Sequence, residues 1–178
     1  MPNPTDYIAN QTAGIDLLFG TTLTGSTALV DTGTLATGYR DLMIFVTGRT
    51  NRATTNGELL VQFNGDSTAA NYEGRYKHTG DSHTDAVASE GFMGYVPGTS
   101  ADASRVTSNE IHVPNHENTT FYKAYHGKTG AISATSFRLQ TDISMLWLDT
   151  SAITSIQFKV FGGDDFLTGT TFSVYGVR

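Results

Sequence analysis

The chain alternates apolar and polar residues over short stretches, a pattern typical of β-strands with one buried face. In "ELLVQF", "IQFKV" and "TFSVYGV", apolar residues recur at every second position from Leu59, Ile156 and Phe172. Gly, Asn, Asp and Thr turns separate such stretches at intervals of about 8 to 12 residues. We therefore predict an all-β protein, an antiparallel β-sandwich of about eight strands that is jelly-roll-like.

The segment "DLMIFVTGR" departs from this alternation because it is apolar on both faces. Leu42, Ile44 and Val46 would lie on one side, and Met43 and Phe45 on the other. This pattern predicts a central strand that is covered on both faces. The Asn56-Gly57 turn signal that follows could join it to the next strand as a hairpin.

One long stretch, residues 64–104, is mostly polar, small and rich in glycine. We predict a long glycine-rich loop region here, because no alternation is evident, and connections of this length are usually functional or mobile. Its aromatic residues are candidate contacts for a partner or a glycan: Tyr72, Tyr76, Phe92 and Tyr95.

The composition supports the β prediction and excludes several classes of function. Only 16% of residues are charged, whereas the chain has 28 Thr, 13 Ser and 19 Gly, which suit strands and turns. A net charge of -6 argues against nucleic-acid binding. There is no cysteine, so disulfides and thiolate metal sites are excluded.

No targeting signal is evident in the sequence. The longest apolar run, Leu42 to Val46, is far shorter than the ~20 residues that a membrane-spanning helix needs. The N-terminal residues lack the basic start and apolar stretch of a secretory signal. We expect a protein that is made in a cytosol, starts near Met1 and has no membrane partner.

Asp31-Thr32-Gly33 matches the triplet that carries the catalytic carboxylate in aspartic proteases. A chain of this composition contains about 0.2 such triplets by chance, and no second copy is present to supply the partner carboxylate. The favoured interpretation is a turn in which the Asp side chain caps backbone amides and Gly33 takes a positive φ. A dimeric aspartic protease remains a remote alternative.

Other candidate chemistry is weak. His112 and His116 have a metal-like spacing, but Pro114 between them prevents the helix that would place both on one face. The acidic residues match no calcium loop, and no nucleophilic serine motif occurs. We therefore predict no metal site, no cofactor and no enzymatic activity.

Two segments resemble small β-sandwich virion structural proteins of tailed bacteriophages. The first is "FNGDSTAANY", with Phe63 to Asp66, Asn71 and Tyr72, and the second is the terminal "GTTFSVYGV", residues 169–177. The likeness extends loosely over residues 39–178. The resemblance implies a two-part chain, in which residues 1–38 form an N-terminal arm with the first strand or strands and residues 39–178 form the sandwich body.

The resemblance implies a structural role in the virion. Similar phage domains occur as capsid decoration or cement proteins and as tips of tail fibres or spikes, commonly as homotrimers. The leading expectation is a capsid decoration protein that contacts itself and other virion proteins, with the major capsid protein as the foremost partner. The alternative is a receptor- or carbohydrate-binding tail module in which the four candidate aromatics and Trp147 stack on sugar rings.

Overall fold

The computed structural model describes residues 14–78, 83–132 and 138–178, and these residues form β-strands joined by turns and loops, with no helix. No described segment is therefore a helix that could cross a membrane. The described strands are, in chain order, β1 (Ile15–Thr22), β2 (Leu29–Asp31), β3 (Asp41–Gly48), β4 (Asn56–Phe63), β5 (Tyr72–His78), β6 (His83–Ala88), β7 (Gly91–Pro97), β8 (Thr107–Val113), β9 (Lys123–Ile132), β10 (Arg138–Trp147), β11 (Ile156–Val160) and β12 (Thr171–Val177).

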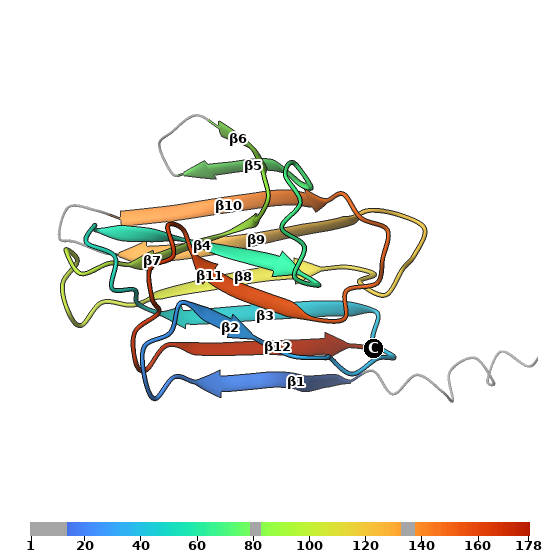
Figure 1. Cartoon of the computed structure of the whole chain (residues 1–178), viewed down its shortest axis with the longest axis horizontal. Helices are drawn as coiled ribbons and strands as arrows, with labels where there is room; N and C mark the ends of the chain where they lie inside the picture. The colour runs from blue at the N-terminus through green and yellow to red at the C-terminus, as the bar shows by residue number, and fades with distance from the viewer. Residues whose placement is uncertain (1–13, 79–82, 133–137) are drawn as a thin grey trace, which may run out of the picture.

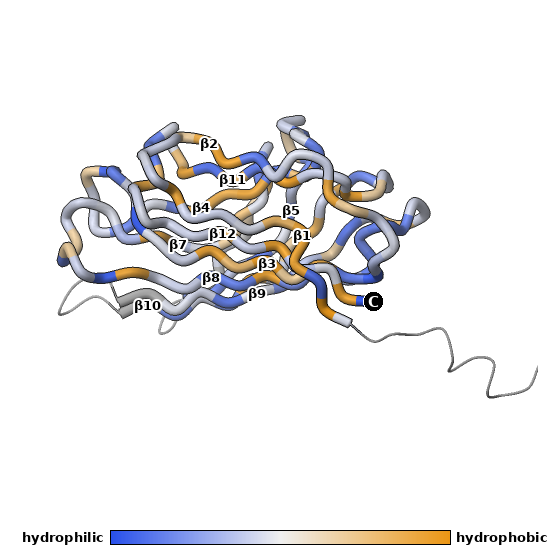
Figure 2. The backbone as a smooth tube through the Cα atoms, turned by 90° about the horizontal axis from the view of Figure 1, so that it is seen from below, coloured by the Kyte–Doolittle hydropathy of each residue, from blue (hydrophilic) through white to orange (hydrophobic). Residues whose placement is uncertain are grey.

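The strands form two antiparallel sheets that pack face to face (Figure 1). The larger sheet has the order β1-β12-β3-β8-β9-β10-β5-β6, and the smaller has the order β2-β11-β4-β7. Figure 2 shows the layers from the side, with β2 and β11 on one side of the molecule and β8, β9 and β10 on the other. The predicted β-sandwich is confirmed.

The chain crosses repeatedly between the two sheets. The hairpins β5–β6 and β9–β10 add four neighbouring strands to one side of the larger sheet. Without them, eight strands remain in two sheets of four, in the orders β1-β12-β3-β8 and β2-β11-β4-β7.

The core lies between the sheets and receives side chains from both. Leu42, Ile44 and Val46 of β3 face apolar residues of the smaller sheet such as Phe158 of β11, and all of them are buried. Burial of each large apolar side chain contributes about 1.5–3 kcal/mol. The alternating positions predicted for β11 and β12 are buried as expected.

Aromatic rings and a buried polar group also hold the layers together. The ring centroid of Phe63 lies 5.6 Å from that of Tyr125 and 5.7 Å from that of Trp147. Asn109 of β8 is fully buried, and its Oδ1 accepts hydrogen bonds from the Tyr95 N–H at 3.1 Å and the Thr129 hydroxyl at 2.8 Å. Because Tyr95 belongs to β7, this carboxamide links the two sheets directly.

The long loop predicted over residues 64–104 is wrong, because this segment contains β5, β6 and β7, and the sandwich has twelve described strands rather than about eight. Its glycines serve close packing as well as turns. A Cβ on Gly91, for example, would collide with the Tyr125 hydroxyl. Glycine content was therefore a misleading signal for a loop in this segment.

One further expectation differs from the structure. Asn56 and Gly57 begin β4 itself, and β3 and β4 lie in different sheets, so they form no hairpin. The described part of the predicted N-terminal region, residues 14–38, contains the strands β1 and β2, which pair with β12 and β11 of the sandwich. The rest of the predicted arm, residues 1–13, lies outside the described residues.

Candidate functional site

Two of the four predicted contact residues lie in the core. Tyr72 begins β5 and is fully buried, and its hydroxyl accepts a hydrogen bond from the Phe63 N–H at 2.8 Å. Phe92 on β7 is 4% exposed. Trp147 is 1% exposed as well. The prediction that these rings are surface contacts is wrong in the isolated chain, because packing occupies them.

Tyr76 and Tyr95 are half-buried and meet Phe92 where β5 and β7 face each other. The rings of Tyr76 and Phe92 stack with centroids 4.3 Å apart, and the Tyr95 hydroxyl lies 3.3 Å from Nε2 of His78. Burial raises the pKa of Tyr95. The structure therefore brings three of the four candidates together, as a cluster that holds β5 against the smaller sheet.

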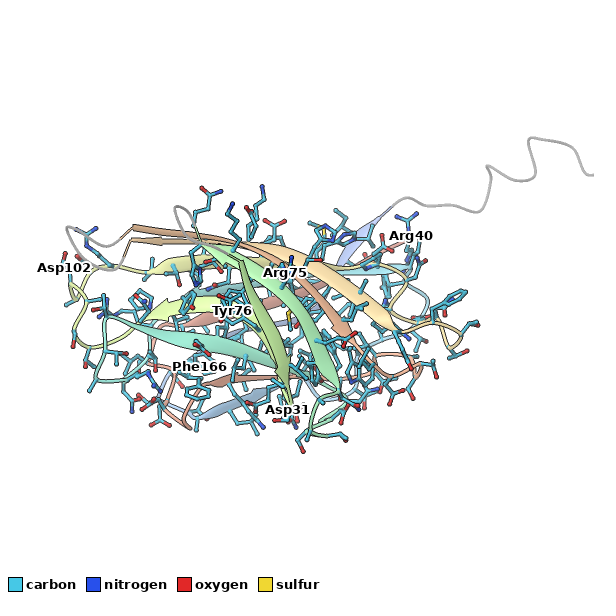
Figure 3. The ribbon with its side chains drawn as sticks, turned by 90° about the horizontal axis from the view of Figure 1, so that it is seen from above. Asp31, Arg40, Arg75, Tyr76, Asp102 and Phe166 are labelled. Atoms are coloured by element: carbon cyan, nitrogen blue, oxygen red, sulfur yellow. The ribbon has the colours of Figure 1, made fainter. Side chains whose placement is uncertain are left out.

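The Asp31-Thr32-Gly33 triplet forms the predicted turn at the end of β2. The Gly33 N–H donates to Asp31 Oδ1 at 2.8 Å, and Gly33 has a φ of 63°. The second carboxylate oxygen accepts from the Gln157 side-chain amide at 2.7 Å. Asp31 lies on the side of the smaller sheet, opposite Arg75 of β5 (Figure 3). One carboxylate oxygen thus caps the turn, which is the structural role expected for this triplet, and the other links β2 to β11.

His112 and His116 lie in different environments. His116 is buried in the turn after β8, and its desolvation lowers its pKa. His112 lies on the outer face of β8, where the centroid of its ring is 5.1 Å from that of His126 on β9. The Nε2 atom of His112 is 3.4 Å from Asp41 Oδ2. In the described part of the chain, no three His, Asp or Glu side chains are placed to hold a metal ion.

The outer face of the larger sheet carries an exposed hydrophobic surface on β1, β12 and β3. We call it the outer apolar patch, and it consists of Ile15, Leu17, Met43, Phe45 and Tyr175. Leu17 pairs with Tyr175, which pairs with Met43, so three large side chains form one row across the strands. Ile15 is 62% exposed and Leu17 is 58% exposed.

The outer apolar patch is hollow at its centre. Ser173 sits between Phe45 and Gly20 in the register, and its small side chain leaves a shallow hollow of about 390 Å³. The residues around it are Ile15, Met43, Phe45, Ser173 and Tyr175. The patch thus has a recess beside the protruding side chains of β1.

The same sheet face becomes charged beyond β3. Glu110, Lys128, Asp142 and Lys77 follow one another in register across β8, β9, β10 and β5, and we call these four residues the charged strip. Opposite charges that face each other across strands contribute about 0.2–1 kcal/mol per pair. A second hollow of about 350 Å³ lies over this part of the face. The charged strip contains two acidic and two basic residues, so its charges balance each other.

A second exposed aromatic site lies in the loop before β9, where Phe121 is 70% exposed and Tyr122 is 55% exposed. Asn118 Oδ1 accepts hydrogen bonds from the Thr120 and Phe121 N–H groups, and the buried Lys123 ammonium donates to the Phe121 carbonyl at 2.9 Å. The loop is therefore held in place by hydrogen bonds. Both aromatics precede β9, which begins at Lys123.

The Phe-Asn-Gly-Asp motif of residues 63–66 has a defined structural role. Asp66 follows β4, and its Oδ2 accepts hydrogen bonds from Trp147 Nε1 at 2.6 Å and Asn71 Nδ2 at 2.9 Å. Burial opposes ionisation of Asp66, but the hydrogen bonds from Asn71, Trp147 and Thr68 outweigh it and lower its pKa to about 2. Asp66 thereby ties the turn after β4 to the end of β10.

Among the described residues, the outer apolar patch and the Phe121 loop are therefore two places where large apolar side chains gather at the surface, whereas Tyr72, Phe92 and Asp31 serve packing and a turn. The signal that pointed to the patch was the double-faced apolar pattern of residues 41–49. Comparison with known proteins finds no matching family model, no matching curated protein and no matching solved structure.

Proposed function

We propose that this protein is a structural protein of a tailed-phage virion, a capsid decoration protein that acts through surface contacts rather than catalysis. The observation that carries this proposal is the outer apolar patch. β3 has the apolar pattern of a strand covered on both faces, yet in the described chain only its inner face is fully buried, and Met43 and Phe45 on the outer face are half-buried. Large exposed apolar patches on soluble proteins mark interaction sites.

The two segments that resemble phage structural proteins support the same proposal. The Phe-Asn-Gly-Asp turn is tied to Trp147 through Asp66, and the terminal strand β12 lies between β1 and β3 in the larger sheet. We also infer that the eight strands outside the two hairpins form a jelly roll, an architecture common in viral capsid and lectin domains. The major capsid protein is then the partner that we expect on the particle.

Immunogold labelling of phage particles that carry this protein tests the proposal. Antibodies against the purified protein are expected to label the head surface evenly, because a decoration protein follows the capsid lattice. Capsids stripped of the protein should also bind it again from solution. Particles without any label, or label confined to the tail, would overturn the decoration proposal.

A carbohydrate-binding tail module is the second candidate, and the Phe121 loop is the observation that favours it. Aromatic rings on a preorganised loop are suited to stacking on sugar rings. The expected result for this candidate is binding to host-cell glycans by the wild type, and its loss in Phe121→Ala and Tyr122→Ala. Glycan binding that persists in both variants would place the sugar contact elsewhere.

A further inference from the structure

The outer apolar patch needs a partner, and we propose that this partner is a second copy of the chain, so that the patch is the interface between subunits. This inference rests on the proposed function, since it names one partner of a protein that acts by contact. It also gives a location to the self-association expected from the sequence. The shape and the charge of the patch support a like copy as its occupant.

The patch is complementary to itself in shape. The protruding side chains of Ile15 and Leu17 lie at the edge of the sheet, and the hollow over Ser173 lies beside them on the next strand. When two such faces meet, the protrusion of one copy can fill the hollow of the other. The same pair of surfaces serves a two-fold contact or a closed ring of head-to-tail contacts.

Charge also favours a contact at this face. The chain has a net charge of -6, so two copies repel each other over most approaches. The outer apolar patch contains no charged residue, and the acidic groups beside it already have partners. Asp16 pairs with Arg178 at 3.0 Å, and Asp41 pairs with Arg40 at 2.9 Å. Two copies can therefore meet here without burying an unpaired charge.

A subunit interface needs more area than the outer apolar patch provides by itself. Three strands about 4.8 Å apart and about 27 Å long offer roughly 400 Å², whereas a stable contact buries about 800 Å² per partner. Adding β8, with Glu110 and His112, brings the area only to roughly 520 Å², so the contact must extend over about six strands of the larger sheet and include part of the charged strip. An apolar centre with a polar margin is the usual composition of such interfaces.

The edge strand of the larger sheet carries part of the patch. β1 pairs only with β12, and its other edge is open in the described chain. β1 contains no lysine or proline, but Asp16 and a bulge between Leu17 and Phe19 protect this edge against pairing with another strand. A second copy seated on the patch would cover the exposed side chains of Ile15 and Leu17.

A matched pair of charge substitutions tests the interface. Leu17→Glu places a carboxylate in the outer apolar patch, while Leu29→Glu changes an exposed leucine of β2 on the other sheet. Light scattering during gel filtration should give two or three times 19.1 kDa for the wild type and for Leu29→Glu. Leu17→Glu should give 19.1 kDa, with an unchanged circular dichroism spectrum.

Cysteine cross-linking provides a second measurement, because the chain contains no cysteine. A tagged Leu17→Cys protein mixed with an untagged Ser173→Cys protein should form a mixed disulfide between copies under mild oxidation. The pair Leu29→Cys and Ser173→Cys should form none. A failure of Leu17→Cys and Ser173→Cys to cross-link above the level of this control would contradict the contact.

The outcomes separate this inference from the proposed function. A concentration of about 100 μM is far above the dissociation constants of stable interfaces. A wild-type protein that is monomeric at this concentration overturns the subunit interface, even when it still binds capsids. An oligomer that Leu17→Glu dissociates supports the interface even when no capsid binds it. An oligomer that both glutamate variants leave intact places the contact on another face and overturns the inference.

Discussion

At the residue scale, Asp66 shows how a single side chain connects two distant segments of the chain. Its carboxylate accepts hydrogen bonds from Trp147 Nε1 and Asn71 Nδ2, and from the Thr68 N–H at 2.9 Å. Charge-assisted hydrogen bonds of this kind are the stronger ones in proteins. The turn after β4 is therefore held to the end of β10 by one ionised group.

We predict that Asp66→Asn lowers the free energy of unfolding by about 1–3 kcal/mol at pH 7, because the amide loses the charge and part of the acceptor capacity. The pKa of Asp66 is about 2 in the folded state, against about 3.9 in an unfolded chain. Its contribution is therefore full above pH 4 and falls as the pH drops from about 4 to about 2.

Urea unfolding of both proteins between pH 7 and pH 3 measures this difference, which should narrow toward the acidic end. Asp102→Asn is the control, because Asp102 pairs with Arg105 at the surface and such pairs contribute little. An equal loss of stability in the two variants would contradict the special role of Asp66.

At the scale of elements, β7 is placed by a close contact with the larger sheet. Gly94 has a φ of 140°, and a Cβ at this position would collide with the Thr129 hydroxyl and the Asn109 carboxamide. These two side chains are fully buried and hydrogen-bonded to each other. The glycine thus lets β7 reach the polar link between the sheets.

We predict that Gly94→Ala destabilises the protein by about 2–4 kcal/mol, because it combines overpacking with an unfavourable backbone conformation. Gly130→Ala on β9 is the matched control, because nothing lies within 4 Å of the added Cβ. It should change stability by less than about 1 kcal/mol. Thermal and urea unfolding of the two variants check this, and similar values for both would refute it.

The elements differ in how well the sequence predicted them. β11 and β12 are predictable because each has one face against the core and its period of two is visible, and β3 is predictable because it is a short apolar run that ends in turn residues. The alternating pattern is hidden in β5, β6 and β7. Charged and hydroxyl residues face solvent on the larger sheet, and glycines replace apolar residues at crowded inner positions. In the sequence, Tyr72 and Phe92 therefore resemble surface contacts in a loop, although their strands bury them.

At the scale of the whole molecule, both sheets contribute to one hydrophobic cluster. Val46 of β3, Phe63 of β4 and Trp147 of β10 all belong to it. Residues from the N-terminal and C-terminal strands meet at the edge of the larger sheet. The body therefore has no internal boundary at which half of it could unfold alone.

We predict a single cooperative unfolding transition, in which Trp147 fluorescence and far-UV circular dichroism change together. Trp147 is the only tryptophan and is 1% exposed, so its emission reports on the core. The midpoint should rise with protein concentration for the wild type but not for Leu17→Glu, because subunit association stabilises the folded state by mass action. Separate transitions for the two signals would contradict a shared core.

The sequence by itself determined the class of this protein. Alternation with a period of two, turn residues at short intervals and many threonines specify strands with one face in a core, because these are local properties of the chain. The Asp31 turn was predictable for the same reason, since its hydrogen bond spans two residues.

Only the tertiary structure decided which surfaces remain open. Strand order brings β1, β12 and β3 together from opposite ends of the chain, and this juxtaposition creates the outer apolar patch. Met43 and Phe45 have the same apolar pattern whether or not a layer covers them. The sequence therefore predicted a strand covered on both faces, whereas the structure leaves the outer face of β3 half-buried. Exposure depends on what packs against a residue, and contacts between distant segments determine that packing.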